Sequence, residues 1–396
     1  MPTKYQKIVE ANIKNVRNAL TELSLDQFLA STIDSLMQME REDYLEQAQD
    51  KGNGFYGRAF NSLNKNCLKI HVPRTRTGDF SPNTLELVKI SQDQVNELCL
   101  SLYKKGMTSR DISDLIQEMF GEGVSATKIT NLSKVFRKFR DAWEKSTLEQ
   151  HYLVMFCDCI FITVRRDDSY TREAVYIAYG VREDLKRELL CLSVNPTEST
   201  YQWGELFDTL KARKVEKIDL IVADGLIGLE EEIHRVFPDC QFQKCVVHKI
   251  RNILNKTRPK DKASIAEDLK EVFGNFHSDA TIQKAVKKVE SFCTKWKRMY
   301  PNIQRFFHED TLEYYFTYIH FDMRVRRMIY TTNSIENLNK IIRKATKNKL
   351  SFESPDTLLD YVFMVLKEFE EKNFMKYPIC EFRHFNARKE DQTQLS

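Results

Sequence analysis

Two apolar runs, each carrying one aspartate, constrain the fold of this chain more than any other feature. The first run, Tyr152–Val164, holds Asp158 near its middle, and the second, Ile218–Ala223, ends at Asp224. β-branched and aromatic residues dominate both runs and turn formers flank them, so we predict two buried strands. An ionised carboxylate is costly to bury without a compensating positive charge, so the pair indicates a nearby cation. Taken singly, each aspartate is better explained as a solvated strand end or as the partner of a Lys or Arg.

Composition predicts a soluble, helix-rich globular protein of two or three domains. The 396 residues include 61 Lys and Arg against 57 Asp and Glu, a net charge of +4, with 42% hydrophobic and 30% charged residues. No apolar run approaches the ~18 residues of a membrane span, and we expect no signal peptide. The 9 cysteines lack disulfide spacing, which indicates reduced thiols and a cytoplasmic protein. Nucleic acid stays open as a partner, because basic residues can gather on one face.

The N-terminal part is predicted to be helical, with a helix-turn-helix domain at its end. Residues 1–90 are expected to combine a helix at about 8–49 with a short strand at 67–76. Residues 91–145 show the pattern of consecutive short helices, the last of which, Ala126–Phe139, follows a Gly turn and is capped by Ser125. A helical bundle that binds no DNA explains this pattern about equally well. The outer positions of the last helix are expected to be Lys128, Lys134, Arg137, Lys138 and Arg140, and the first four are the candidate DNA contacts.

The order of elements after residue 150 predicts an α/β core. Three strands come first, followed by a helix, the strand before Asp224, a second helix and a last strand at about 240–247. This β-β-β-α-β-α-β order is the one we expect of a ribonuclease H-like fold.

A helical insertion is expected to interrupt this core. Residues 251–325 are almost entirely helical in pattern, so the core would comprise 150–250 and 326–375, with a tail at 376–396. The chain as a whole is therefore predicted to be an α+β multidomain protein.

A third carboxylate, Glu336, lies at the start of a helix far downstream. Asn333 is a good N-cap and Glu336 occupies the third helical position, so a capping box alone could account for it. On the same helix face, Glu336 is followed by Lys340, Arg343 and Lys347. The opposite, buried face is expected to comprise Ile335, Leu338, Ile342 and Ala345. A carboxylate followed by basic residues on one helix face is compatible with a nuclease, in which the carboxylate binds metal and the basic residues bind phosphates. The alternative is a charged helix face that is only solvated.

Three carboxylates on separate elements are enough for metal-dependent cutting of DNA. Two divalent ions about 3.5–4 Å apart can activate the nucleophile and stabilise the leaving oxygen. Hard oxygen ligands suit Mg²⁺ or Mn²⁺. Asp158 would bridge both ions, while Asp224 and Glu336 would each hold one.

Six short motifs, in this order, resemble the transposases of Mutator-like bacterial insertion sequences. They are Gly78-Asp79-Phe80, Lys105–Ile112, Asp158 on its strand, Asp224–Gly228, Cys245–His248 and Thr331–Glu336. The resemblance covers roughly residues 54–349 and implies a DDE transposase with a ribonuclease H-like catalytic core. It implies Asp158, Asp224 and Glu336 as the catalytic, metal-binding triad for two Mg²⁺ (or Mn²⁺) ions. It also implies binding of terminal inverted repeats and target DNA, in a homodimer or higher oligomer associated with the nucleoid.

Cys245 and His248 stand three positions apart, a spacing that invites a zinc interpretation. A structural zinc site usually has four ligands, and no Cys-x-x-Cys occurs in the chain. The segment instead has the pattern of a strand that turns into a helix, with Cys245 as a small buried apolar residue. The resemblance supports a role at the active site, so we expect His248 close to Asp158 and Asp224, as a further catalytic residue, with Cys245 packed beneath it.

Other functions are compatible with the same residues. A non-catalytic or domesticated DNA-binding protein would keep the fold without cutting, and a metal-dependent, structure-specific nuclease would cut without strand transfer. A purely structural helical protein would leave the aligned carboxylates unexplained.

Overall fold

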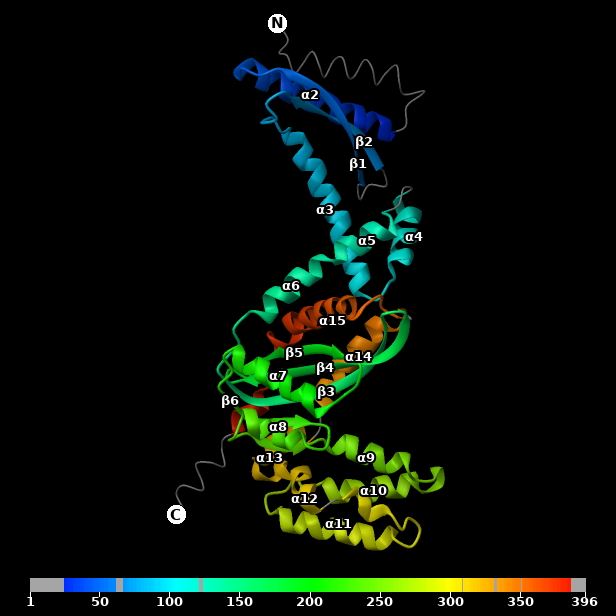
Figure 1. The fold of residues 1–396 in the computed structure, drawn as a ribbon, viewed down its shortest axis with the longest axis vertical. Coiled ribbons are helices and arrows are strands. Elements are labelled where there is room, and N and C mark those ends of the chain that lie inside the picture. The colour runs from blue at the N-terminus through cyan, green and yellow to red at the C-terminus, as the bar shows by residue number, and fades with distance from the viewer. Residues whose placement is uncertain are drawn as a thin grey trace. The chain divides into compact units, whose positions relative to one another are not determined.

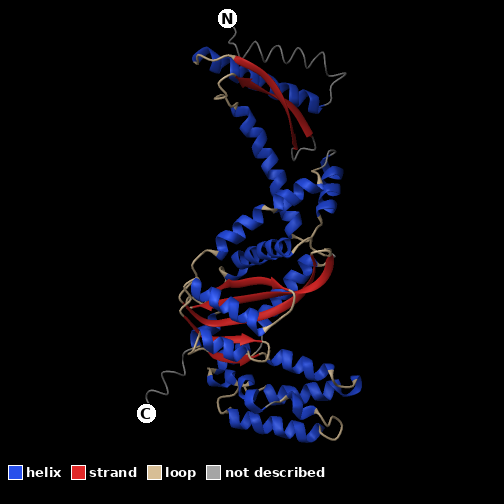
Figure 2. Cartoon of the chain, viewed as in Figure 1, coloured by secondary structure: helices blue, strands red, loops and turns tan. Residues whose placement is uncertain are grey.

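The computed structural model describes residues 25–61, 67–120, 124–307, 309–330, 333–349 and 351–385. The chain forms two compact units, Met1–Val135 and Phe136–Ser396, whose elements are labelled in Figure 1 and coloured by type in Figure 2. The first part of the helix expected at 8–49 and most of the expected tail at 376–396 lie outside the described residues.

The first unit begins with a helix packed on a two-stranded sheet. Helix α2 (Leu25–Gln47) covers the antiparallel pair β1 (Gly52–Asn61) and β2 (Cys67–Thr75). The core of this part of the unit consists of Met37, Phe60, Ile70 and Val72, together with Leu85 and Val88 of the helix that follows. The strand predicted at 67–76 is confirmed as β2, whereas β1 was not predicted. The glycines of β1 interrupt the alternating pattern by which a strand is predicted. Gly54 has a φ of +69°, and the register of the strand pair shifts between Gly52 and Phe55.

Three helices follow in this unit: α3 (Asn83–Lys104), α4 (Ser109–Phe120) and α5 (Ala126–Ser133). The Ser125 hydroxyl accepts a hydrogen bond from the backbone N–H of Lys128 at 3.2 Å, so the predicted cap of α5 is confirmed.

The single helix predicted over Ala126–Phe139 is wrong, because the segment forms two helices. Helix α5 ends at Ser133 and α6 runs from Val135 to Glu144. The Ser133 hydroxyl donates to the Thr130 carbonyl at 2.8 Å, and this competition with the backbone favours a break. Helix α6 then packs within the second unit. The outer position predicted for Arg140 is wrong, because Arg140 is buried there and its Nε donates to Asp360 at 2.7 Å.

The second unit is built on a mixed five-stranded sheet with the strand order β5-β4-β3-β6-β7. Its strands are β3 (His151–Arg166), β4 (Ser169–Arg182), β5 (Arg187–Asn195), β6 (Lys217–Ala223) and β7 (Gln241–Lys244). Strands β3, β4 and β5 pair antiparallel, and β6 and β7 run parallel to β3. The predicted order of strands and helices is therefore confirmed for this part of the chain.

Helices cover both faces of this sheet (Figures 1 and 2). Helices α7 (Thr200–Ala212) and α8 (Leu229–Val236) pack on one face, where Met155 and Cys157 of β3 meet Trp203 and Ile233. Helices α14 (Asn333–Thr346) and α15 (Pro355–Phe369) contact β3 from the other side. Because side chains alternate along a strand, Asp158 faces α14 while Cys157 faces α7 and α8.

A helical segment separates β7 from α14, and residues 251–325, which were predicted to be helical, lie within it. Its main helices are α9 (Val246–Asn255), α10 (Lys262–Phe273), α11 (Ile282–Trp296) and α13 (Met323–Ile329). Shorter turns are η1 (Pro259–Asp261), η2 (Ile303–Phe306), α12 (Glu309–Leu312), η3 (Glu313–Tyr315) and η4 (Thr317–His320), with η5 (Glu370–Phe374) and η6 (Cys380–His384) after α15. The N–H of Val246 donates to the Tyr330 carbonyl at 3.2 Å, so the segment enters and leaves the core at adjacent points.

Within the described ranges, no helix is both long enough and apolar enough to cross a membrane.

Candidate active site

Asp158 and Asp224 lie on neighbouring parallel strands. Strand β3 pairs with β6 in the register Phe156 opposite Val222. Two residues beyond this pair, Asp158 lies on β3 and Asp224 directly follows the last residue of β6, so both lie near the same end of the two parallel strands. Asp158 is only 6% exposed, whereas the side chain of Asp224 is 45% exposed. The sheet therefore offers one buried and one accessible carboxylate at the same edge.

The environment of Asp158 is built to hold a buried carboxylate. Its Oδ1 accepts from the N–H of Cys159 at 2.9 Å, and its Oδ2 accepts from Asn339 Nδ2 at 2.6 Å. Burial raises the pKa of Asp158, as does the charge of Asp224, while His248 and these two hydrogen bonds oppose the rise. The site thus combines a desolvated anion with donors that keep it charged.

Asn339 was not identified from the sequence, although its position carried a signal. It is 4% exposed and lies on the face of α14 formed by Ile335, Leu338 and Ile342, all of which are buried as predicted. A buried amide on an apolar helix face needs a polar partner, and here the partner is Asp158. Asn339 Oδ1 is buried and has no hydrogen-bond partner among the described residues, so it is an acceptor left free beside Asp158.

His248 lies where the end of β6 meets the start of α9. Its Nδ1 is 3.8 Å from Asp224 Oδ1, and Cys245, fully buried, donates its N–H to the Ala223 carbonyl at 2.7 Å. A hydrogen bond with Cys245 is the main cause that raises the pKa of His248 to about 9. Burial opposes the rise, and electrostatic interactions with Cys245, Asp224 and Asp158 add to it. This shift favours the protonated form of the imidazole beside the two carboxylates.

Glu336 is directed toward Arg251 of α9. Its Oε1 accepts from Arg251 Nη2 at 2.7 Å, and its side chain is 20% exposed. Glu336 precedes Asn339 by three residues, so the two side chains share a helix face, one turn apart. The structure thus brings together Asp158, Asp224 and His248 and sets Glu336 one helical turn from the residue that binds Asp158. In the parts of the chain that the structure describes, no group of three or more His, Cys, Asp or Glu side chains could hold a metal ion.

Two further charged residues near the acidic edge had not been singled out. Burial, followed by the charge of Asp224, raises the pKa of Glu198, which precedes α7. Burial and the charge of Lys244 lower the pKa of Lys249 to about 8, although Asp224 opposes this. Glu198 lies in sequence just before the helix predicted after the first three strands, and Lys249 follows His248, but nothing in their spacing indicates a role at this site.

The predicted DNA-contacting residues lie on exposed helix surfaces. Lys340 and Arg343 on α14 and Lys347 just beyond it are exposed, as are Lys128 on α5 and Lys134 after it. Arg137 and Lys138 lie on α6 and are also exposed. Arg137 is ion-paired with Asp356 of α15, so its charge is already matched within the protein.

Whole-chain comparisons define what kind of protein carries this site. The chain is a transposase: a model of the Mutator family of transposases matches residues 3–376, and the chain belongs to that family. It is 29% identical over 364 residues to the transposase for insertion sequence element IS1201 of Lactobacillus helveticus, which covers 91% of this chain and 94% of the relative. It is 31% identical to the transposase for IS905 of Lactococcus lactis, over 81% of this chain and 80% of the relative.

Among solved structures, the chain has a weak likeness to a protein described as the Drosophila P element transposase strand transfer complex. The sequence identity is 11% and the TM-score 0.30, over 76% of this chain and 86% of the other, which is too low to define a shared fold. The resemblance to Mutator-like transposases noted from the six motifs is confirmed by the family match.

Proposed function

We propose that this chain is the transposase of a mobile insertion sequence that binds the terminal inverted repeats of its element and cuts and joins DNA in a metal-dependent reaction. Asp158, Asp224 and Glu336 are the proposed catalytic triad, within a ribonuclease H-like catalytic core. The observation that carries the proposal is the contact of Asp158 with Asn339, because it joins the helix of Glu336 to the strand edge shared with Asp224. The strand order β5-β4-β3-β6-β7 supports the assignment of the core.

The side chains at this edge fit a hard divalent cation. Asp158 and Asp224 supply carboxylate oxygens, and the free, buried Oδ1 of Asn339 adds a neutral oxygen beside them. Such oxygen donors suit Mg²⁺ or Mn²⁺ and suit zinc less well. Asp158 and Asp224 would hold the metal. Glu336 would become a third ligand when its ion pair with Arg251 breaks. Two bound ions would lower the barrier to in-line attack on a phosphodiester by activating the attacking oxygen and stabilising the leaving one.

The protein's own cations would bind and orient the scissile phosphate. The raised pKa of His248 favours the protonated imidazole, in which both ring nitrogens can donate to a phosphate oxygen. Arg251 would gain a phosphate partner when it releases Glu336, since a guanidinium binds phosphate in the same bidentate way as carboxylate. The exposed stripe of Lys340, Arg343 and Lys347 would hold the DNA backbone further along α14.

Recognition of the element's ends is assigned to the first unit. Helices α4 and α5, of which Ser125 caps the second, are proposed as a helix-turn-helix. Lys128 and Lys134 are its proposed DNA contacts. Lys138 would add a phosphate contact from α6. The active form is proposed to be a homodimer or larger assembly, in the cytoplasm at the nucleoid, because two DNA ends must be joined to one target.

The test is incubation of the full-length protein with linear DNA that carries the element's own ends, with Mg²⁺ and then with EDTA. We expect the wild-type protein to cleave the DNA ends with Mg²⁺ and not with EDTA. We expect Asp158→Ala, Asp224→Ala and Glu336→Ala to bind the ends without cleaving them. Full cleavage by Glu336→Gln would reduce that residue to a helix-capping role. Binding without any cleavage by the wild-type protein would favour the non-catalytic DNA-binding alternative.

A further inference from the structure

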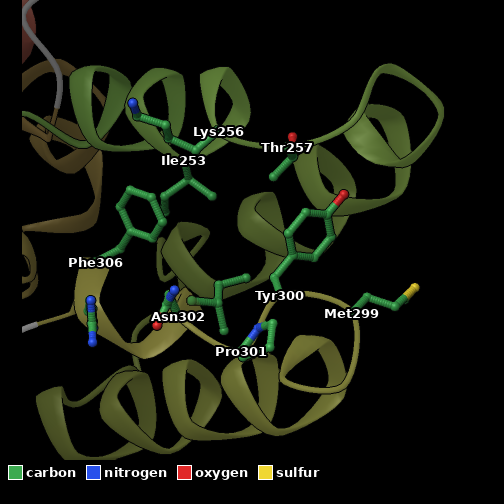
Figure 3. A pocket seen from close by; sticks show the side chains of 10 residues that line it. Ile253, Lys256, Thr257, Met299, Tyr300, Pro301, Asn302 and Phe306 are labelled. Atoms are coloured by element: carbon green, nitrogen blue, oxygen red, sulfur yellow. The ribbon is translucent and has the colours of Figure 1, made fainter.

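A cavity of about 410 Å³ lies in the helical segment after the candidate active site (Figure 3). Helix α9 and the residue just beyond it supply Ile253 and Lys256, and the chain after α11 supplies Tyr300 and Phe306. Figure 3 shows the two aromatic rings on opposite sides of the space, with Ile253 on the α9 side. Its size lies within the ~300–1,000 Å³ range of sites that enclose small organic groups. The lining thus forms a slot between two aromatic side chains.

Tyr300 is held rigidly at this slot. Its hydroxyl donates to Asp261 Oδ2 at 2.6 Å and accepts from the N–H of Arg258 at 3.1 Å. The Arg258 guanidinium lies 5.4 Å from the ring centroid. A side chain fixed at its polar end loses little entropy when a planar group stacks on its ring, so Tyr300 is a preformed stacking platform.

The rim of the cavity is strongly basic. Lys256 and Arg305 line it, are exposed, and form no ion pair with any residue that the structure describes. Between residues 249 and 262 the chain carries six Lys or Arg and a single acidic residue, Asp261, which already contacts Tyr300. An apolar aromatic slot with free cations at its mouth matches a nucleotide, whose base is flat and whose phosphates are anionic.

Helix α9 connects this cavity to the candidate active site. His248 and Arg251 face the carboxylates from the first part of the helix, and Ile253 lines the cavity from its last part. At 1.5 Å per residue, His248 and Ile253 are about 7.5 Å apart along the axis and His248 and Lys256 about 12 Å. At a rise of 3.4 Å per nucleotide in one strand, these axial separations correspond to roughly two to four nucleotides.

We propose that this cavity binds one nucleobase turned out of the DNA helix two to four nucleotides from the scissile phosphate, stacked on Tyr300 and held by phosphate contacts to Lys256 and Arg305. The proposal rests on the proposed function, since it takes the DNA at the carboxylates as given. An extruded base unpairs the DNA beside the cut, which makes the scissile strand easier to bend into the site and fixes its register.

The test is photocrosslinking of full-length Asp158→Asn protein to end DNA. We expect this variant to bind the DNA without cutting it. Each DNA carries one 5-iodouracil, placed from one to six nucleotides on either side of the cleavage point. We expect a crosslink to the segment Met299–Phe306 at one position, two to four nucleotides from the cut. Adding Tyr300→Ala should lower this crosslink and the affinity for end DNA roughly 5- to 150-fold, the effect of losing one stacked base.

Control variants keep the test independent of folding. Lys256→Glu changes an exposed side chain and should also weaken the crosslink, so the proposal can be judged if Tyr300→Ala does not fold. Tyr201→Ala removes an exposed tyrosine of α7, whose hydroxyl contacts only Glu205 in the described structure, and should leave the crosslink unchanged.

The outcomes separate this inference from the proposed function. Cleavage of end DNA by wild-type protein without a crosslink to Met299–Phe306 at any position would overturn the nucleobase site alone. A crosslink that Tyr300→Ala and Lys256→Glu both leave intact would overturn it as well. Wild-type protein that neither binds nor cuts its own ends would overturn the proposed function, and this inference with it.

Discussion

Replacing Asn339 with alanine tests how the candidate active site holds its buried carboxylate. The Asn339 amide donates to Asp158 at 2.6 Å, and the two residues are 4% and 6% exposed. Removing the donor leaves a buried charged group with one hydrogen bond fewer, which costs about 1.5–3 kcal/mol of the free energy of unfolding. Asn337→Ala, on the exposed side of the same helix, is the matched control, because it shares the change in helix propensity without touching Asp158.

The effect of Asn339→Ala should depend on pH. Burial raises the pKa of Asp158 above its unfolded value, so folding disfavours the charged carboxylate and stability falls as pH rises through the range between the two values. Loss of the Asn339 hydrogen bond raises this pKa further. The deficit relative to Asn337→Ala should therefore shrink as pH falls, because protonation of the Asp158 carboxyl removes the charge that the Asn339 hydrogen bond stabilises.

Urea unfolding followed by tryptophan fluorescence measures this deficit. All 3 tryptophans, at 143, 203 and 296, belong to the second unit, so the signal reports on the unit that contains the site. Equal stabilities of Asn339→Ala and Asn337→Ala at pH 7, or a deficit that grows as pH falls, would refute the reasoning.

Two other predictions concern the helical segment and the DNA contacts. Arg326 is fully buried and donates to the carbonyls of four residues. Arg326→Met should therefore lower the free energy of unfolding by about 3 kcal/mol or more and expose residues 251–325 to limited proteolysis. Arg324→Met, at an exposed position, should do neither. Lys134→Ala should weaken end binding and lower the slope of log affinity against log salt by about 0.9. Arg137→Ala should change that slope less, because Asp356 already pairs with Arg137; equal slopes for the two variants would count against this distinction.

Much of the second unit could be predicted from the sequence because its signals are local. Runs such as Tyr152–Val164 are apolar enough to be buried strands in any context, and they form β3 and its neighbours in the predicted order. The apolar spacing of Ile335, Leu338 and Ile342 likewise fixed the buried face of α14. Periodicity identifies such elements because burial on one face is a property of the segment itself.

The remaining features depend on contacts between distant segments. The break between α5 and α6 follows from local competition at Ser133, but also from the attraction of Arg140 to Asp360, which lies 220 residues away in the sequence. Asn339 and Arg251 were missed for the same reason, because their partners Asp158 and Glu336 come from other elements. The predicted domain limits and the catalytic roles of the site residues stay predictions.

The binding of divalent metal to the carboxylates tests the central proposal most directly. Mn²⁺ bound to the full-length protein in the presence of end DNA can be counted by electron paramagnetic resonance, for the wild type and for Asp158→Asn, Asp224→Asn and Glu336→Gln. The account predicts two bound ions per active site in the wild type, their loss in Asp158→Asn, and weaker binding in the other two variants. Undiminished Mn²⁺ binding by Asp158→Asn would contradict it.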